Sequence, residues 1–337
     1  MGICEESRTY PKKLALILMC AVIVVSALIF ALFAFSDIKS VHSGGTFEIT
    51  DGMSVSQVAD GLKNDGIIRF PSAFRLVSKL ENYDRKIKPG TIKIERGMSY
   101  DDILNLCVNA APELNKIVIP EGYEIKEIAQ KVSNLVSEED FYNALSEKYD
   151  YKFLENIPER EVLLEGYLFP ATYEFKDGVT AREIVDTMLK TFDEHFPDEY
   201  YKRAKELNMT TDEIVTLASI IERESSSGEE RPKIAGVFYN RLKINMRLQS
   251  CATVQYILKQ RKANLSAEDT KIKSPYNTYL HEGLPPGPIS SPGEECIKAA
   301  LYPESTDALY FVLGSDGKHI FSKSYEEHLK AKNRKAE

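Results

Sequence analysis

A single long apolar segment stands out near the start of the chain. The 22 residues that precede Ser36 read LALILMCAVIVVSALIFALFAF, and Ser26 is the one strongly polar position among them. A helix of this length is roughly 33 Å long, enough to cross a hydrocarbon core of about 30 Å. The flanking basic residues gather before the segment, at Arg8, Lys12 and Lys13, and only Lys39 follows closely. The positive-inside rule therefore predicts a transmembrane helix over residues 14–36, with residues 1–13 as a cytoplasmic tail.

The alternative for this segment is a cleaved signal peptide. Apolar cores of signal peptides usually contain about 7–15 residues, and Ala34-Phe35-Ser36 is a poor cleavage site. We therefore expect a single-pass protein of the cell membrane, with a cytoplasmic N-terminus and everything after residue 36 extracytoplasmic.

Four later segments share a second pattern, in which a β-rich run is followed by a glycine turn and an amphipathic helix. They begin at Phe47, Ile92, Ile117 and Tyr173, and their turn glycines are Gly52, Gly97, Gly122 and Gly178. These glycines suit a turn position with positive φ, and Ser54, Ser99 and Thr180 then stand at N-cap positions. The spacing between copies varies, which excludes a solenoid of fixed period. A common unit that recurs by chance stays an alternative.

The first two copies frame a small module. A helix that starts at Pro71, a permitted first-turn position for proline, lies between them and predicts a β-α-α-β order over residues 46–96. This order resembles the LysM fold, a small module that binds glycan chains. We expect an α+β protein with a LysM-like βααβ subdomain at residues 45–112 and a larger mixed α/β domain at residues 113–335.

The clearest helix of the second half is TDEIVTLASIIERES, residues 211–225, with Thr211 as its expected cap. Its apolar face follows an i, i+3, i+4, i+7 pattern: Ile214, Leu217, Ala218 and Ile221. Glu222 and Glu224 fall on opposite flanks of that face, each some 70–90° from its centre, so periodicity does not choose between them. A glutamate at the edge of a buried face is a place for a carboxyl with a raised pKa, able to act as an acid near neutral pH. A solvated glutamate paired with Arg223 or Arg231 is the alternative.

Residues 274–293, SPYNTYLHEGLPPGPISSPG, hold too many Pro and Gly for a helix or strand and predict a long ordered loop. Tyr276, Asn277, Thr278 and Tyr279 suit sugar recognition, because aromatic rings stack on apolar sugar faces while amides and hydroxyls bond the ring substituents. A disordered linker is the alternative. Residues 308–313 and 319–321 then predict two strands around a Ser-Asp-Gly turn, followed by a final helix.

Composition excludes several classes of protein. The 337 residues are 43% hydrophobic and 28% charged, an ordinary globular balance. Forty-three Lys and Arg against 51 Asp and Glu give a net charge of −8, which disfavours nucleic-acid binding. The five cysteines and five histidines are scattered and include no CxxC pair, so we expect neither a disulfide framework nor a metal site.

Together these motifs match one known family. Besides the segments quoted above, the chain contains IPEG at 119–122, LEGYLFP at 164–170, VFYNRL at 237–242, MRLQS at 246–250 and YFV at 310–312. Over nearly its whole length it resembles the YceG-like (MltG) family of endolytic murein transglycosylases, with residues 113–335 as the catalytic domain. The resemblance implies a membrane-anchored lyase that cleaves peptidoglycan glycan strands between N-acetylmuramic acid and N-acetylglucosamine. Its products would end in 1,6-anhydro-N-acetylmuramic acid, and it would need no cofactor.

The resemblance also implies the site. In the family the first glutamate of the ASIxExE motif is catalytic, which is Glu222 here. One carboxyl suffices, because it protonates the leaving oxygen and then takes the proton of the C6 hydroxyl that attacks within the same sugar. Glu224 is the second choice, because Glu224-Ser225 resembles the Glu-Ser pair of soluble lytic transglycosylases. The substrate-binding positions are Glu165, Gln249, Tyr276, Asn277 and Tyr279, and the implied partners are peptidoglycan strands, the cytoplasmic membrane and penicillin-binding proteins.

Three positions depart from the family pattern. Cys251-Ala252 stands where the family has Asp-Pro, Ala171 where it has Asp, and Ile92 where it has the tyrosine of a PGTY motif. The first two remove carboxylates close to catalytic motifs and leave Glu222 in place. Two other functions therefore stay open: a catalytically silent glycan-binding scaffold, and a hydrolytic muramidase, which would need a second catalytic carboxylate.

Overall fold

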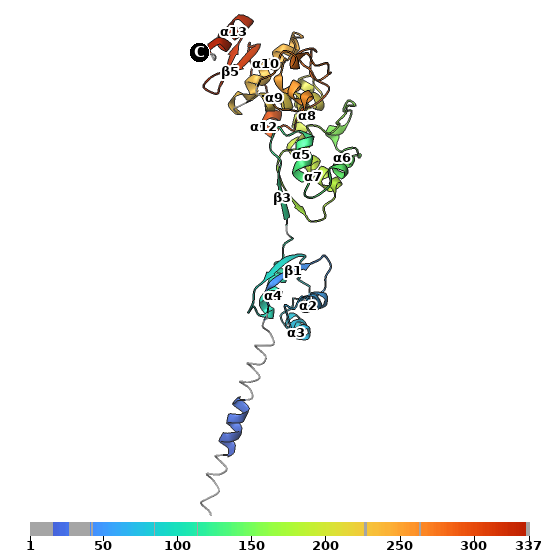
Figure 1. Cartoon of the computed structure of the whole chain (residues 1–337), viewed down its shortest axis with the longest axis vertical. Coiled ribbons are helices and arrows are strands. Elements are labelled where there is room, and N and C mark those ends of the chain that lie inside the picture. Colours follow the sequence, from blue (N-terminus) through green and yellow to red (C-terminus); the bar gives the residue numbers. More distant parts are fainter. Residues whose placement is uncertain are drawn as a thin grey trace, which may run out of the picture. The chain divides into compact units, whose positions relative to one another are not determined.

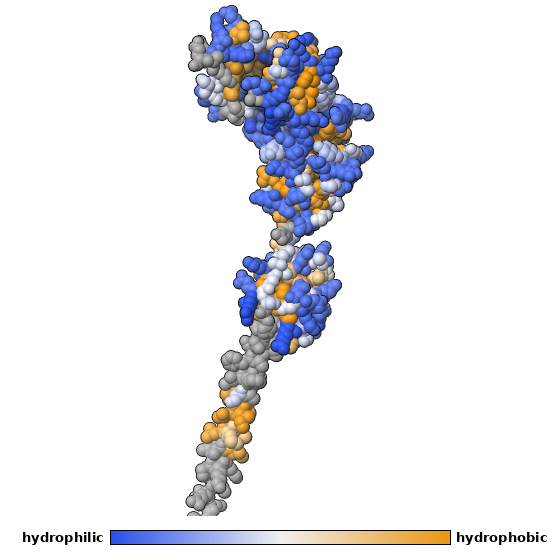
Figure 2. Space-filling view, in the orientation of Figure 1, coloured by the Kyte–Doolittle hydropathy of each residue, from blue (hydrophilic) through white to orange (hydrophobic). Residues whose placement is uncertain are grey.

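The computed structural model describes residues 16–26, 41, 43–83, 85–112, 114–225, 228–262 and 264–334. Residues 16–26 are helical and expose apolar side chains (Figure 2). No helix in this described part is long and apolar enough to cross a membrane. Residues 14–15 and 27–36 of the predicted transmembrane segment lie outside the described residues, so the segment stays a prediction.

The chain divides into two compact units, Met1–Glu113 and Leu114–Glu337. In the first, the elements follow the order β1 (Gly45–Ile49), α2 (Val55–Asn64), α3 (Pro71–Leu80), β2 (Gly90–Ile94) and α4 (Tyr100–Val108) (Figure 1). Strands β1 and β2 pair antiparallel, with Phe47 opposite Ile92. The predicted β-α-α-β order is confirmed, whereas the resemblance to LysM stays a prediction.

Alternation along β1 and β2 builds the core of this unit. Phe47, Ile49, Ile92 and Ile94 point inward and are at most 7% exposed, and Phe74 and Tyr100 pack in the same cluster as an edge-to-face pair. Ile92, which replaces the family's tyrosine, is therefore a core residue here.

All four predicted strand–turn–helix units are present. Gly52, Gly97, Gly122 and Gly178 have φ of 76°, 90°, 74° and 74°, in the left-handed region that only glycine adopts without strain. The predicted caps of α2, α4 and α7 each accept a backbone N–H three residues on. Local turn and cap chemistry therefore sets where these helices begin.

The second unit is a helical assembly with two small antiparallel sheets. The sheets pair β3 (Leu114–Val118) with β4 (Thr172–Lys176) and β5 (Tyr310–Leu313) with β6 (His319–Ser322). The helices are α5 (Ile125–Val132), α6 (Glu138–Leu145), α7 (Ala181–His195), α8 (Asp198–Glu206), α9 (Thr211–Glu224), α10 (Arg231–Lys243), α11 (Cys251–Leu258), α12 (Glu294–Leu301) and α13 (Tyr325–Arg334). The predicted C-terminal hairpin and final helix are confirmed.

Helix α9 lies at the centre of this unit. Helices α8, α10, α11 and α12 all contact it, and every residue from Ile214 to Ile221 is buried, which is more than the one face predicted. The predicted cap is wrong by one residue. Thr210 is the N-cap, because its hydroxyl accepts the Glu213 N–H while the Glu213 carboxylate accepts the Thr210 N–H.

The loop of residues 274–293 packs onto α9 without forming a helix or strand. The Ile289 N–H donates to the Ser219 hydroxyl at 3.0 Å, and the Ser291 N–H donates to the Tyr123 carbonyl at 2.8 Å. These bonds inside the unit confirm an ordered loop rather than a linker.

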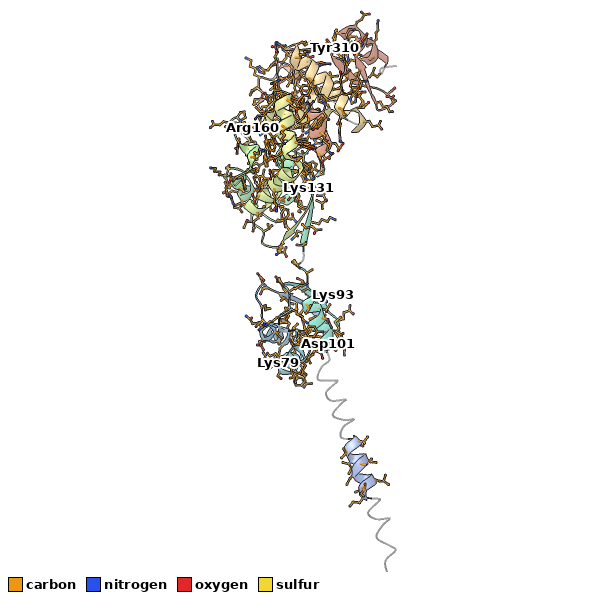
Figure 3. The ribbon with its side chains drawn as sticks, turned by 180° about the vertical axis from the view of Figure 1, so that it is seen from behind. Lys79, Lys93, Asp101, Lys131, Arg160 and Tyr310 are labelled. Atoms are coloured by element: carbon orange, nitrogen blue, oxygen red, sulfur yellow. The ribbon has the colours of Figure 1, made fainter. Side chains whose placement is uncertain are left out.

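A buried arginine ties this loop and the LEGYLFP segment to α9 (Figure 3). Arg160 donates to both oxygens of Asp212 at 2.9 Å and to the Pro286 carbonyl at 3.2 Å. The Tyr167 hydroxyl donates to the same Asp212 carboxylate at 2.7 Å. The arginine and aspartate side chains are only 2% and 9% exposed, so each needs the other to offset the loss of solvation.

Asp212→Ala should therefore lower the free energy of unfolding by about 3–5 kcal/mol, because it leaves the Arg160 charge buried without a partner. Glu326→Ala, which removes an exposed ion pair with Lys330 on α13, is the control and should change little. Urea unfolding of both variants measures the difference. Equal, small losses would show that the buried pair does not hold these loops in place.

Candidate functional site

The carboxylate of Glu222 lies at the C-terminal end of α9, with a side chain only 7% exposed. Its Oε2 accepts the backbone N–H of Gly293 at 2.9 Å, and its Oε1 lies 3.6 Å from Arg231 Nη2. The Gly293 bond fixes the carboxylate against the end of the 274–293 loop. The group is thus held in one orientation by backbone from another segment.

A second carboxylate, Glu121, lies beside it and was missed in the sequence. Arg231 Nη2 is 3.6 Å from Glu121 Oε2 as well as from Glu222. Burial and the Glu222 charge raise the pKa of Glu121 above its usual range. The sequence signal for Glu121 was its position directly before Gly122, the turn glycine of the IPEG segment. The turn at Gly122 lies against the Glu222 side chain, which brings Glu121 close to Glu222.

Glu224 occupies a different environment at the start of α11. It accepts the hydroxyl of Ser250, and its charge also acts on Arg241 and Tyr279. Gln249 adopts φ of 46°, a strained conformation for a residue other than glycine, and its N–H donates to the Thr278 carbonyl at 3.0 Å. The structure therefore brings Gln249 and Tyr279 together with Glu224.

Cys251, where the family has aspartate, belongs to this group. Its sulfur lies 3.1 Å from the Tyr279 hydroxyl, and burial raises the pKa of its thiol. A neutral thiol therefore replaces a carboxylate close to Glu224.

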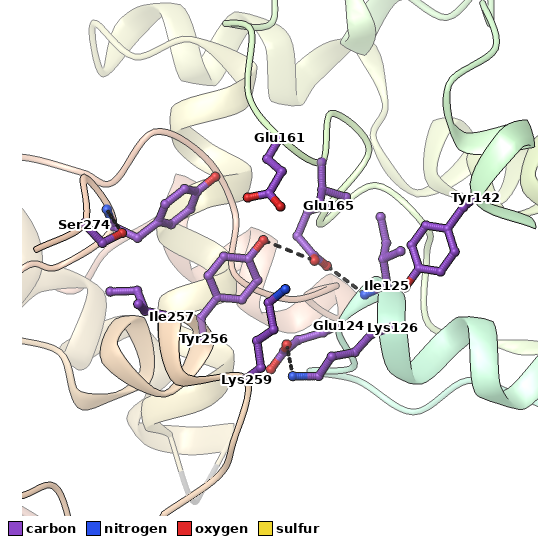
Figure 4. A pocket seen from close by; sticks show the side chains of 12 residues that line it. Glu124, Ile125, Lys126, Tyr142, Glu161, Glu165, Tyr256, Ile257, Lys259 and Ser274 are labelled. Carbon is purple, nitrogen blue, oxygen red and sulfur yellow. Dashed lines mark hydrogen bonds and ion pairs between the residues drawn. The ribbon is translucent and has the colours of Figure 1, made fainter. Parts of the chain in front are cut away.

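A cavity of about 480 Å³ is lined by residues of α5, α6 and α11 and of the loops at 161–165 and 274–276 (Figure 4). Its walls carry three tyrosines, Tyr142, Tyr256 and Tyr276, and two lysines, Lys126 and Lys259. The Tyr256 and Tyr276 rings are 5.1 Å apart and tilted, so they form one aromatic wall. An amphipathic sugar or peptide of moderate size fits such a lining.

Glu165 is a buried carboxyl in the wall of this cavity, at 3% exposure. Its oxygens accept the Ile125 N–H at 3.1 Å and the Tyr256 hydroxyl at 3.4 Å (Figure 4). Burial, with the Glu124 charge, raises the pKa of Glu165 to about 8. At neutral pH the carboxyl is mainly protonated and can donate a hydrogen bond into the cavity.

Arg223 connects these environments. Its guanidinium lies 3.3 Å from Glu124, which lines the cavity, and donates to Gln255 of α11 at 3.4 Å. Lys126 holds the other oxygen of Glu124 at 2.8 Å. Among the residues that the structure describes, no group of three or more His, Cys, Asp or Glu side chains could hold a metal ion.

Asn277 is set apart from the other candidates. It is fully buried, its amide donates to the carbonyls of Thr270 and Ile272 at 3.1 and 2.8 Å, and its oxygen accepts the Tyr279 N–H at 3.0 Å. These bonds hold the loop that carries Tyr276 and Tyr279. In the structure the Asn277 amide holds the loop. Direct contact between Asn277 and a glycan stays a prediction.

Comparison with known proteins finds a family and several relatives of this chain. Residues 47–334 match the model of the YceG-like family. A protein of Streptococcus pneumoniae serotype 2 (strain D39 / NCTC 7466), named endolytic murein transglycosylase, is 34% identical over 315 residues, covering 84% of this chain and 57% of its own length. A protein of the same name from Bacillus subtilis (strain 168) is 35% identical over 301 residues, covering 85% and 83%. This chain therefore spans little more than half the length of the streptococcal relative.

A solved structure is similar as well. The crystal structure of a yceG-like protein from Listeria monocytogenes has a TM-score of 0.59 and 35% identity, and the match covers 86% of this chain and 98% of that one. Sequence and fold therefore point to the same family.

Asn277→Ala should lower the free energy of unfolding by about 1–3 kcal/mol, because it leaves two partly buried carbonyls and one N–H without their partner. Lys273→Ala, an exposed change in the same segment, is the matched control. Thermal unfolding of both proteins measures the effect. If Asn277→Ala unfolds like the control but loses substrate binding, the amide contacts the substrate and does not hold the loop.

Glu165→Gln should become more stable relative to the parent as pH rises from about 5 to 8. The native state keeps the proton of Glu165 up to a pKa of about 8, whereas the unfolded chain releases it near pH 4.3. Parental stability falls across this window because the unfolded state binds fewer protons than the native state. Glu161→Gln, an exposed carboxyl of the same cavity, is the control, and parallel pH curves for parent and Glu165→Gln would show that Glu165 is ionised.

Proposed function

Because the chain belongs to the YceG-like family, we propose that it is an endolytic lytic transglycosylase that cleaves peptidoglycan glycan strands between N-acetylmuramic acid and N-acetylglucosamine. The support from comparison is that its relatives in two genera are both named endolytic murein transglycosylase. The structural observation that carries the proposal is Glu222, a nearly buried carboxyl fixed by a backbone N–H at the end of the central helix.

In this mechanism one carboxyl acts twice. Glu222 protonates the leaving glycosidic oxygen, and the resulting carboxylate accepts the proton of the C6 hydroxyl as that oxygen attacks the anomeric carbon. The nucleophile belongs to the substrate, so no water enters and the product is a 1,6-anhydro sugar. The bond from Gly293 orients the carboxyl, and Arg231 stabilises the negative charge it carries between the two transfers.

The cavity beside α9 is proposed to bind a neighbouring part of the strand. Tyr276 and Tyr256 offer an aromatic wall, and protonated Glu165 donates to an acetamido or peptide carbonyl. Gln249 and Tyr279, near Glu224, extend the contact surface along α11. The segment from Glu121 to Glu124 runs from Glu222 to this cavity, so a polymer can contact both.

The setting at the membrane is part of the proposal. Residues 14–36 anchor the chain in the cytoplasmic membrane with the N-terminus inside, and the LysM-like subdomain and catalytic domain lie outside. Nascent glycan strands are made at this surface, and penicillin-binding proteins are the expected neighbours. The basic flank of the apolar segment supports the orientation.

A hydrolytic muramidase is the second candidate, because Glu121 places another carboxyl next to Glu222. A retaining hydrolase needs two carboxyls about 5–5.5 Å apart, one of them as nucleophile. Glu121→Gln separates the two functions. A lyase that uses Glu222 alone keeps most of its activity, whereas a hydrolase that uses the pair loses it.

Glu222→Gln should slow strand cleavage by about 10²–10⁴-fold, because the amide keeps the shape of the side chain and removes the proton transfer. Glu224→Gln should reduce cleavage only modestly, since its partner Ser250 can bond an amide as well. The measurement is the rate of muropeptide release from purified peptidoglycan by liquid chromatography and mass spectrometry.

The pair of variants is its own control, because the two glutamates lie on the same turn of α9. An inactive Glu224→Gln with an active Glu222→Gln would transfer the catalytic role to Glu224. Absence of cleavage by the parent would favour the silent scaffold, with Cys251 and Ala171 as the departures to revert.

A further inference from the structure

Helix α3 of the N-terminal unit turns an apolar face to solvent. Leu76 and Leu80, one turn apart, are 50% and 67% exposed, and Phe70, directly before the helix, is 37% exposed. The opposite face, with Phe74 and Val77, packs into the core of the unit. Single exposed leucines are normal in soluble domains, but a clustered set on one short helix marks an interaction surface.

Basic side chains border this face. Lys79 is exposed one turn from Leu76 on α3 (Figure 3 labels Lys79). Arg69, which precedes the helix, is exposed and lies over the Phe70 ring at 5.5 Å. Arg75 pairs with Asp60 of α2, which neutralises one charge. Residues 63–88 contain seven Lys or Arg and three Asp or Glu, a net charge of +4 in a chain whose total is −8. The positive charge is therefore concentrated around α3.

The path of the chain brings this face close to the proposed anchor. Ser43 donates to the Gly66 carbonyl at 2.7 Å, so the first described residues of the unit lie beside the segment that leads into α3. Four residues separate position 36 from Val41, so the five steps between them can extend at most about 3.6 Å each, or roughly 18 Å in total. The proposed anchor therefore keeps Val41 within about 18 Å of the end of the apolar segment, and with it the unit that carries α3.

We propose that the exposed face of α3 docks on the anionic phospholipid surface of the membrane that holds the anchor. Leu76, Leu80 and Phe70 enter the headgroup region, while Arg69 and Lys79 contact lipid phosphates along its border. This proposal rests on the proposed anchor. It is independent of the chemistry at Glu222, and it restricts the orientation of the N-terminal unit on the membrane.

The absence of tryptophan from the chain gives a direct probe. Leu76→Trp places a single fluorophore on the proposed face, and Thr46→Trp places one on the exposed side of β1, opposite the core, as a matched control. Full-length protein is reconstituted in vesicles of phosphatidylcholine brominated on its acyl chains, or of unlabelled phosphatidylcholine with brominated phosphatidylglycerol, since bromine quenches tryptophan only on contact. Flotation of the vesicles with both variants reports on the anchor.

The expected result is a blue-shifted emission and loss of most fluorescence for the Leu76→Trp protein with brominated phosphatidylglycerol, and neither for Thr46→Trp. Adding Arg69→Gln and Lys79→Gln to Leu76→Trp should restore most of the emission. Flotation without quenching overturns the docking surface and leaves the anchor intact. Blue-shifted emission without quenching means that protein covers α3, and equal quenching by brominated phosphatidylcholine overturns the anionic preference. Failure of both variants to float overturns the anchor and the docking with it.

Discussion

The burial of α9 is the constraint on which the rest of the catalytic unit depends. Because Ile214 to Ile221 are enclosed on all sides, the next three residues leave the core on one turn and point in three directions. Glu222 meets Gly293 and Arg231, Arg223 meets Glu124 and Gln255, and Glu224 meets Ser250. One helix end thus carries a fixed carboxyl, an arginine that pairs with a residue of the cavity wall, and a second carboxyl. The loop that supplies Gly293 is tied to the start of α9 by Arg160, which pairs with Asp212 and donates to the Pro286 carbonyl.

The carboxyl groups around this end differ in their environments, and that difference separates their proposed roles. Glu165 is enclosed and bonded by one N–H and one hydroxyl, which is too little to offset burial, so its pKa rises to about 8. The pKa of Glu121 rises partly because the Glu222 charge is close. Glu222 itself accepts a backbone N–H and lies 3.6 Å from Arg231, so its carboxyl is held in one orientation at the end of α9.

Sequence alone predicted what local chemistry determines. The four glycine turns, the caps Ser54, Ser99 and Thr180, the β-α-α-β order and the C-terminal hairpin all depend on residues close in the chain, and the structure confirms them. The cap of α9 was misplaced because two adjacent threonines compete, and the partner at Glu213 decides for Thr210. Glu121 and the supporting role of Asn277 depend on contacts between distant segments, which periodicity does not encode.

The central claim is that the attacking oxygen belongs to the substrate, and cleavage in H₂¹⁸O tests it most directly. Peptidoglycan digested by the full chain in labelled water is analysed by mass spectrometry of the released muropeptides. The account predicts anhydro-ended fragments that lack one water relative to reducing ends and carry no ¹⁸O. Reducing-end fragments that carry ¹⁸O would contradict it and would make Glu121 and Glu222 the pair of a hydrolase.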